Sequence, residues 1–500
     1  MHHPSELPLV SCARAHAART AILAPEGTFT YHDLLDASAA VASSLLAGAR
    51  DLREARVAFL APPGWHYVVA QWSIWRAGGI AVPLAVSHPP AELEYVIQDA
   101  DAAIVLAHPE FAAVLRPIAG QAGRRFLLTS EALQADLSSL PKVDQSRGAL
   151  IIYTSGTTGK PKGVVTTHAN LQAQVASLVK AWEWSAEDRA LLVLPLHHVH
   201  GIVNVLTCAL WSGATCEILP KFDAEAVWSR IELGRLTLFM AVPTIYARLI
   251  AAWEAASPER QRRMSTGCQR MRLMVSGSAA LPVQTLERWR EISGHTLLER
   301  YGMTEIGMAL SNSLRGERRP GFVGVPLPGV QVRLVDEEGR EVQAGTAGEI
   351  EVRGPTVFLE YWRRPDAPRE VFREGWFRNG DVGVVEDGHY RILGRRSVDI
   401  IKTGGYKVSA LEIEEVLRTH PAVAECAVVG VEDAEWGERI CVAIELRDGA
   451  GLKLDELQPW AREHLAPYKI PRDLQVVTAL PRNAMGKVVK PDVAALFTAS

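Results

Sequence analysis

The first third of the chain alternates between helix-like and strand-like patterns, and this alternation restricts the fold more than any other feature. Residues 31–48 carry apolar side chains at helical spacing up to Gly48, and residues 56–64 form an apolar strand closed by a Pro-Gly turn. The same order returns in residues 66–79, a helix ended by two glycines, and in the strand 80–84. Such alternation predicts an α/β fold with layered helices and sheets.

A change of pattern in the last fifth of the chain predicts a second, smaller domain. Residues 394–408 are dense in charge and glycine, and they follow a β-rich stretch. Beyond them Ser409 and Glu412 match a capping box at the start of a helix, which must end before Pro421, and further strands and a helix follow. We expect a large N-terminal domain of layered α/β subdomains and a small α+β C-terminal lid domain. Their expected bounds are 1–394 and 395–500.

The charge balance argues against nucleic acid or an anionic membrane as a partner. Lysine and arginine total 53 against 57 aspartate and glutamate, a net charge of −4, whereas such partners call for a clustered basic excess. The longest apolar run, 191–211, contains Pro195 and three histidines, so we interpret it as a buried segment and expect no membrane span.

Cysteine usage and the N-terminus predict a cytoplasmic protein. The start of the chain lacks the continuous apolar core of a signal peptide. The six cysteines are scattered without a CxxC pair, which is typical of reduced thiols and does not favour a disulfide or zinc framework.

The stretch "YTSGTTGKPKG", residues 153–163, has the composition of an anion-binding loop. Its glycines let backbone N–H groups approach a ligand closely, and its hydroxyls and two lysines suit a phosphate. Its spacing departs from the Walker A pattern, because Pro161 follows Lys160 where a magnesium-binding hydroxyl is required. A phosphate loop of a different kind is favoured, with an ordinary polar turn between two strands as the alternative.

Six motifs in order resemble those of the acyl-adenylate-forming superfamily, which includes acyl-CoA synthetases, luciferases and peptide-synthetase adenylation domains. They are "YTSGTTGKPKG", "ERYGMTE" (299–305), "GEIEVRGP" (348–355), "GWFRNGDVG" (375–383), "GRRSVDIIKTGGYKV" (394–408) and "PRNAMGK" (481–487). The resemblance implies an enzyme that joins a carboxylate to AMP, releases pyrophosphate and then passes the acyl group to a thiol. Holding a carboxylate against a triphosphate requires dense positive charge and N–H donors.

The resemblance assigns ATP and a magnesium ion to particular residues. Thr304 would contact the α-phosphate, and Glu305 would hold Mg²⁺. The residues expected to cradle the β- and γ-phosphates are Thr154, Ser155, Gly156, Thr157, Thr158 and Lys160.

The nucleoside is assigned in the same way. Asp381 matches the family aspartate that accepts both ribose hydroxyls, although a turn aspartate after Gly380 is the alternative. Arg395 would support the ribose or a phosphate. The adenine slot is expected to consist of the segment 276–281, with Ser276, Gly277 and Ser278 as its binding residues, together with Tyr301 and Gly302.

The small domain is expected to supply a catalytic lysine and the thiol-acceptor site. Lys487 matches the family lysine that bridges the carboxylate and the α-phosphate, a task that suits a point charge on a long stem. A bend near 396–399 would be the hinge about which this mobile lid turns. After that turn Gly404 and Gly405 would leave backbone room for the pantetheine arm of CoA.

The cluster "HHVHG", residues 197–201, invites a zinc hypothesis. We identify no distant Cys, Asp or Glu partners for its three histidines, so zinc is not favoured. In the superfamily this stretch lines the acyl pocket, and His200 is expected at the pocket wall.

Within the superfamily the motifs look most like those of malonyl-CoA and methylmalonyl-CoA synthetases. A diacid leaves one carboxylate charged in the pocket, and an arginine fork best compensates it. Arg248 matches the malonate-binding position, with Ser278 as a hydroxyl partner and Arg272 as a weaker alternative, and Met308 would border the C2 substituent.

We therefore predict an ATP- and Mg²⁺-dependent acid–CoA ligase that forms malonyl-CoA and possibly methylmalonyl-CoA from the free diacid and CoA. The alternative is a CoA synthetase for another short- or medium-chain carboxylic acid; a peptide-synthetase adenylation domain is less favoured. A sensor that binds adenylate without turnover would be expected to have lost Lys487 or Glu305, and both are present.

Overall fold

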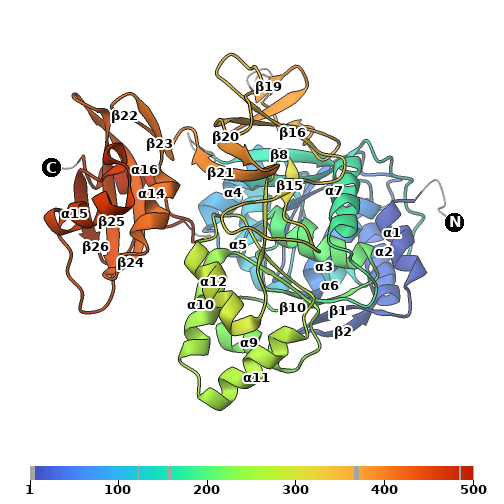
Figure 1. Cartoon of the computed structure of the whole chain (residues 1–500). Coiled ribbons are helices and arrows are strands. Elements are labelled where there is room, and N and C mark those ends of the chain that lie inside the picture. Colours follow the sequence, from blue (N-terminus) through green and yellow to red (C-terminus); the bar gives the residue numbers. More distant parts are fainter. Residues whose placement is uncertain (1–5, 122, 155–159, 365–370, 484–485, 499–500) are drawn as a thin grey trace.

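The computed structural model describes residues 6–121, 123–154, 160–364, 371–483 and 486–498. A large N-terminal part holds most of the helices and three of the four sheets, and a small C-terminal domain lies to one side of it (Figure 1). The fold is mixed α/β with a large and a small domain, which confirms the predicted fold class.

The alternating N-terminal segment forms a seven-stranded sheet of order β18-β8-β7-β4-β3-β5-β6. Its inner strands pair in parallel, whereas β7 and β8 are antiparallel. The strands are β3 (Arg56–Leu60), β4 (Ile80–Pro83), β5 (Ile104–Ala107), β6 (Arg125–Leu128), β7 (Gly148–Thr154), β8 (Lys162–Thr167) and β18 (Glu360–Tyr361).

A second sheet has nine strands in the order β15-β14-β13-β12-β11-β9-β10-β1-β2, with parallel pairing from β13 to β1. Parallel strands end at a common edge, where ligands of α/β sheets usually bind. The strands are β1 (Thr20–Ala24), β2 (Gly27–Thr30), β9 (Arg189–Leu192), β10 (Thr215–Ile218), β11 (Leu238–Ala241), β12 (Leu273–Ser276), β13 (Leu298–Met303), β14 (Gly307–Ser311) and β15 (Val325–Pro326).

Helices of the large domain pack on these two sheets. A capping box sets the start of the first long helix, α2. Thr30 Oγ1 accepts a hydrogen bond from the Asp33 N–H at 3.1 Å, and the Asp33 carboxylate accepts one from the Thr30 N–H at 2.7 Å. The helix ends at Leu46, and the next residue, Ala47, caps it with a φ of +47°. The helices are α1 (Pro8–Ala15), α2 (Tyr31–Leu46), α3 (Trp65–Arg76), α4 (Pro90–Asp99), η1 (Pro109–Phe111), α5 (Ala112–Gln121), α6 (Thr129–Ala132), α7 (His168–Ala181), η2 (His200–Thr207), α8 (Cys208–Trp211), α9 (Ala224–Glu232), α10 (Pro243–Glu254), α11 (Pro258–Gln269) and α12 (Val283–Ser293).

The third sheet lies beyond the other two, at the top of Figure 1. It has the order β16-β17-β20-β19, with β21 paired to β20. The strands are β16 (Gln331–Val335), β17 (Gly348–Arg353), β19 (Phe372–Arg373), β20 (Trp376–Glu386) and β21 (His389–Arg395).

The fourth sheet belongs to the small domain and has the order β23-β22-β25-β24, with β26 paired to β25. Strand β21 of the third sheet ends at Arg395 and the fourth sheet begins at Ile400, so the domain change falls in this interval; the boundary at 394/395 stays a prediction. The elements are β22 (Ile400–Thr403), β23 (Tyr406–Ser409), α14 (Ala410–Leu417), β24 (Val423–Asp433), β25 (Gly437–Leu446), α15 (Leu454–His464), η3 (Pro467–Lys469), β26 (Asp473–Val477) and α16 (Lys490–Ala495).

The predicted capping box of the small domain is half realised. Ser409 Oγ accepts a hydrogen bond from the Glu412 N–H at 3.2 Å, as expected for the first residue before α14. The Glu412 carboxylate instead pairs with Lys469. Among the described residues, no helix is both long and apolar enough to cross a bilayer.

Candidate active site

The predicted adenine-slot residues lie together at the ends of two neighbouring parallel strands. Ser276, the last residue of β12, is in register with Glu299 of β13, so the segment 276–278 lies beside Tyr301 and Gly302. Glycine is required at Gly302, where a Cβ would lie 2.2 Å from the Gly307 carbonyl oxygen, whereas a Cβ on Gly277 would lie 2.5 Å from the Arg300 guanidinium and would displace it. The structure therefore brings these residues together, and adenine binding by them stays a prediction.

Asp381 on β20 is the centre of a polar cluster. Its two carboxylate oxygens accept hydrogen bonds from Arg395 Nε at 2.8 Å and from the Tyr301 hydroxyl. The side-chain amide of Asn379 donates to the same hydroxyl at 2.9 Å, and its oxygen accepts from the Asp381 N–H at 2.9 Å. Each carboxylate oxygen has a second lone pair. The cluster can therefore fix Asp381 while leaving acceptor capacity for two hydroxyls.

Replacing Asp381 by alanine is expected to weaken ATP binding, because the ribose hydroxyls lose a charged acceptor. A hydrogen bond to a charged group contributes about 1.5–3 kcal/mol, which corresponds to roughly 10- to 150-fold in the dissociation constant. Calorimetric titration with ATP measures this change. Asp387→Ala, in the exposed turn after the same strand, is the matched control. Equal ATP affinity in the parent and in Asp381→Ala would contradict the ribose role.

Thr304 and Glu305 lie in the turn between β13 and β14. The Glu305 side chain is buried, and one carboxylate oxygen accepts a hydrogen bond from the Tyr361 hydroxyl at 2.9 Å. Burial raises the pKa of Glu305, and no lysine or arginine among the described residues forms an ion pair with it. A bound cation would offset this burial cost.

Mg²⁺ fits this carboxylate. In nucleotide sites magnesium is commonly held by one or two carboxylates together with phosphate oxygens and water. The described part of the chain has no group of three or more metal-ligating side chains, so Glu305 would share the ion with the phosphates of ATP. Thr304 is half-buried beside it.

The predicted phosphate loop is described only at its two ends. Thr154 closes β7 and lies opposite Lys162 of β8, so the loop starts and ends at adjacent positions of one hairpin. Lys160 Nζ lies 5.5 Å from the centroid of the Tyr95 ring, and the Tyr95 hydroxyl donates to the Pro161 carbonyl at 2.9 Å. The remaining assignments lie outside the described residues, and phosphate binding by the whole set stays a prediction. They are Ser155, Gly156, Thr157 and Thr158.

Two of the predicted acyl-pocket residues meet a buried arginine that the sequence analysis missed. Ser278 Oγ lies 3.2 Å from His200 Nδ1 and accepts a hydrogen bond from Arg300 Nη2 at 3.4 Å. Arg300 is 4% exposed, and its Nε has no hydrogen-bond partner among the described residues. No described carboxylate forms an ion pair with it, so its charge is available to an anion.

Electrostatics support this view of the pocket. Burial lowers the pKa of Arg300. Burial, reinforced by Arg300, lowers the pKa of His200 far below its usual range, so His200 is neutral and can serve as a hydrogen-bonding wall. In the sequence Arg300 stands beside a second charged residue, Glu299, in the segment that forms strand β13, and nothing there indicates that both side chains are buried.

The three other pocket predictions have different environments. Arg248 is exposed on α10, and no contact with Ser278 or His200 is found in the described chain, so its malonate role stays a prediction. Arg272 is already engaged: its guanidinium donates twice to the Asp188 carboxylate, at 2.7 Å each, which argues against the weaker alternative. Met308 is buried on β14 and packs against the backbone of Gly302.

Lys487 of the small domain faces the large-domain site. Its side chain keeps solvent contact, yet surrounding protein, followed by Arg300 and Arg395, lowers the pKa of Lys487, whereas Asp381 opposes the shift. The Lys487 ammonium is therefore close enough to Arg300, Arg395 and Asp381 for their charges to shift its pKa. Its role in bridging a carboxylate and an α-phosphate stays a prediction.

The predicted pantetheine segment forms the turn between β22 and β23. Gly404 and Gly405 have φ values of +53° and +82°, a conformation that favours glycine. The Gly404 N–H donates to the Trp436 carbonyl at 2.9 Å, within the same domain. The role of this turn toward CoA stays a prediction.

A large layered α/β domain followed by a small C-terminal domain is the architecture of adenylate-forming ligases. The chain belongs to the AMP-binding enzyme family: the family model matches residues 10–362, and the model of the AMP-binding enzyme C-terminal domain matches residues 412–487. The resemblance drawn from the motifs is thereby confirmed, and the chain is an AMP-forming acyl-CoA ligase by family.

Three relatives are informative. A mitochondrial malonate–CoA ligase ACSF3 from Xenopus laevis is 49% identical and covers 97% of this chain and 91% of its own. ATP-bound MatB from Rhodopseudomonas palustris is 34% identical, covers 98% of this chain and 99% of its own, and has a TM-score of 0.91. A malonyl-CoA ligase with methylmalonyl-CoA and AMP bound is 38% identical, covers 95% and 100%, and has a TM-score of 0.70.

Proposed function

We propose that this chain is a malonate–CoA ligase that forms malonyl-CoA from malonate, CoA and ATP through malonyl-AMP. The observation that carries the proposal is the buried Arg300 guanidinium, which has no ion-pair partner among the described residues and donates to Ser278, itself in contact with His200. We assign these three residues to the acyl pocket. A monoacid would leave the Arg300 charge uncompensated, whereas the second carboxylate of malonate would pair with it. The names of the relatives above agree with this choice of acid.

The geometry suggests how the first step proceeds. With the distal carboxylate of malonate on Arg300, the near carboxylate points toward Lys487. Its oxygen attacks the α-phosphorus of ATP, a new O–P bond forms, and the bond to the bridging oxygen breaks so that pyrophosphate leaves. Lys487, Thr304 and the phosphate loop stabilise the charge that develops on the phosphate oxygens.

In the second step the CoA thiolate attacks the acyl carbon of malonyl-AMP, the thioester bond forms and AMP leaves with both electrons of the C–O bond. We assign the approach of CoA to the turn at Gly404 and Gly405, after a rotation of the small domain. The difference between the TM-scores supports two orientations: this chain resembles the ATP-bound neighbour more than the CoA-product complex, although the latter is more identical in sequence.

We assign Mg²⁺ to Glu305, where it would neutralise charge on the ATP phosphates. The buried carboxylate with a raised pKa supports this assignment. A magnesium titration of pyrophosphate release should show a higher half-saturating concentration for Glu305→Gln than for the parent. Identical magnesium titration curves for the parent and for Glu305→Gln would contradict the assignment of Glu305 as a magnesium ligand.

A substrate panel tests the proposed function. Acid-dependent pyrophosphate release is measured with malonate, methylmalonate, acetate, butyrate and octanoate in parallel, each with and without EDTA. Malonate is expected to give the highest kcat/KM, and EDTA is expected to abolish release. Methylmalonate is accepted if Met308 leaves room for its methyl group. A preference for a monoacid would establish the alternative, a synthetase for another short- or medium-chain acid.

For the cellular compartment we retain the cytoplasmic prediction, based on the scattered cysteines. The Xenopus relative is named as mitochondrial, so the compartment is tested independently of the activity. Fractionation of the source cells, with an antibody against the chain, distinguishes the two.

A further inference from the structure

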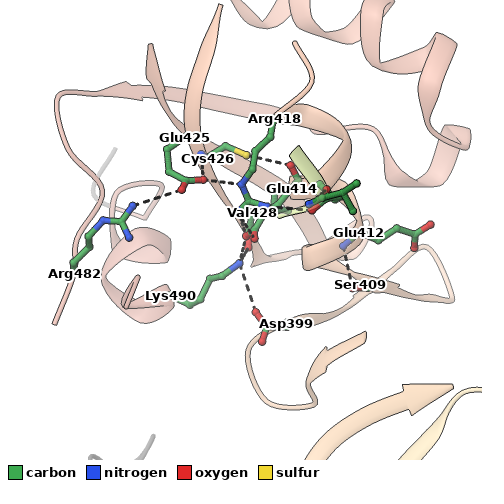
Figure 2. Close-up of polar contacts among 12 residues, drawn as sticks. Asp399, Ser409, Glu412, Glu414, Arg418, Glu425, Cys426, Val428, Arg482 and Lys490 are labelled. Carbon is green, nitrogen blue, oxygen red and sulfur yellow. Dashed lines mark hydrogen bonds and ion pairs between the residues drawn. The ribbon is translucent and has the colours of Figure 1, made fainter. Parts of the chain in front are cut away.

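A buried charge network in the small domain joins Lys490 to Glu414 and Asp399 (Figure 2). Lys490, three residues after Lys487, begins α16. Its ammonium donates to the Val428 carbonyl at 2.6 Å and to the Glu414 carboxylate, and it lies 3.5 Å from Asp399 Oδ1. The side chains of Lys490, Glu414 and Asp399 are only 12%, 4% and 14% exposed. Such a network fixes the position of its members more than a surface ion pair does.

Asp399 connects this network to the large domain. While Oδ1 faces Lys490, Oδ2 accepts a hydrogen bond from the Arg395 N–H at 2.9 Å, and the Asp399 N–H donates to the Arg395 carbonyl at 2.7 Å. Arg395 closes β21 and holds Asp381. One carboxylate therefore joins strand β21, whose Arg395 holds Asp381, to the residue that begins α16.

The bond between Arg395 and Asp399 spans the interval in which the chain passes from one domain to the other. A rotation about 396–399 must change this bond, whereas the contacts of Lys490 with Glu414 and Val428 lie inside the small domain and move with it. The Asp399–Lys490 contact is thus placed where it can favour one orientation of the small domain over the other.

A second anchor holds the other end of the Lys487 segment. Arg482 Nη1 donates to the Gly486 carbonyl at 2.9 Å, and Arg482 lies 3.8 Å from the Glu425 carboxylate. Glu425 accepts from Arg418 Nε at 2.8 Å, and Arg418 pairs with Glu414 at 3.4 Å. Lys490, on one side of Lys487, therefore contacts Glu414 directly, and Arg482, on the other side, reaches the Glu414–Arg418 pair through Glu425.

We propose that Lys490, together with Asp399, is a positioning residue that sets Lys487 against the ATP site for adenylation. The proposal rests on the role assigned to Lys487 under the proposed function. A flexible lysine stem can act on a developing charge only if its backbone is fixed, because a misplacement of about 1 Å can cost roughly 100-fold in rate. The network supplies this fixation and links it to the orientation of the small domain.

The test separates the two half-reactions in Lys490→Met, Lys490→Arg and Asp399→Asn. Adenylation is measured as acid-dependent ATP–pyrophosphate exchange, and transfer as CoA-thioester formation from supplied acyl-AMP. Lys490→Met is expected to slow adenylation about 10- to 100-fold and to change transfer little. Lys490→Arg is expected to restore most of the loss. Equal loss in both half-reactions, or unchanged adenylation, would overturn the proposal.

Two further variants exclude a merely structural effect. Adding Lys490→Met to Lys487→Ala is expected to give no further loss of adenylation, because Lys490 acts through Lys487. Lys469→Gln, which breaks an ion pair with Glu412 on the same helix α14, is expected to leave the ratio of the half-reactions unchanged. An additive loss in the double variant, or an equal shift in Lys469→Gln, would contradict a positioning role.

The design distinguishes this proposal from the proposed function. If malonate is the wrong acid, the parent enzyme itself lacks malonate-dependent exchange, and the ratios are measured with the acid that the panel selects. Asp399→Asn leaves the Lys490–Glu414 pair in place, so it carries the test if Lys490→Met fails to fold. An Asp399→Asn protein that folds and adenylates like the parent would refute the link to the hinge.

Discussion

Lys487→Ala is expected to reduce adenylate formation by about 100- to 1,000-fold, the usual effect of removing one preorganised group that stabilises transition-state charge. Transfer of the acyl group from supplied malonyl-AMP to CoA is expected to stay near the parental rate. The reason is that in the present orientation of the small domain the charges of Arg300, Arg395 and Asp381 influence the pKa of Lys487, and we expect the rotation for the thioester step to move Lys487 away from them. Pyrophosphate exchange and thioester formation, measured separately, give the two rates.

Lys453→Ala is the control for this variant, since Lys453 is an exposed lysine of the same domain. It is expected to leave both half-reactions unchanged. Acetylation of Lys487 removes the same charge and is expected to reproduce the alanine variant. A parallel loss of adenylation and transfer in Lys487→Ala would show that the lysine supports the fold or both steps, against the assigned role.

The layered α/β class and the small C-terminal domain could be predicted because local signals agree with the fold. Residues 31–48 carry a helical apolar pattern, and the structure starts this helix with the reciprocal cap of Thr30 and Asp33. Pro421 likewise stops the helix predicted after Ser409, which ends at Leu417. Apolar periodicity and helix-capping residues depend on neighbours within a few positions along the chain, so they can be recognised in the sequence alone.

The burial of Arg300 beside Ser278 could not be predicted in this way. On α10 the buried positions include Ile245, Tyr246 and Leu249, and Arg248 lies on the opposite, exposed face. Arg300 lies on β13, which has a neighbour on each side, and its burial depends on strand pairing over a long range. The motif resemblance selected Arg248 by its position in the sequence, whereas the burial of an arginine side chain depends on these packing contacts.

The charge network of the small domain shows the same limit of local patterns. Lys490 meets Asp399, Glu414 and Val428, which are far from it along the chain. Only the packing of α16 and α14 on the strand β24 brings these residues together. The half-formed capping box has a similar cause, because Lys469 competes for the Glu412 carboxylate.

The choice of acid is tested most sharply by Arg300→Leu. If the Arg300 guanidinium pairs with the distal carboxylate of malonate, leucine leaves that carboxylate facing an apolar wall. Removing one partner of a buried ion pair typically costs about 3–5 kcal/mol, which is roughly two to four powers of ten in kcat/KM. Butyrate has no distal charge, so its kcat/KM is expected to be kept or to rise. The ratio of the two values is the quantity to measure, because a folding defect lowers both together.

Arg248→Leu is the matched variant that decides between the two arginines. Arg248 is exposed on α10, so if Arg300 is the selector, its replacement leaves the malonate-to-butyrate ratio close to the parental value. A collapse of the ratio in Arg248→Leu, with Arg300→Leu unaffected, would instead support the sequence-based assignment and would require α10 to turn toward the pocket when malonate binds. If neither variant changes the ratio while both proteins remain folded, no arginine of this pair holds a second carboxylate. The preference for a diacid would then lose its physical basis in the pocket, and the family would define the reaction without defining the acid.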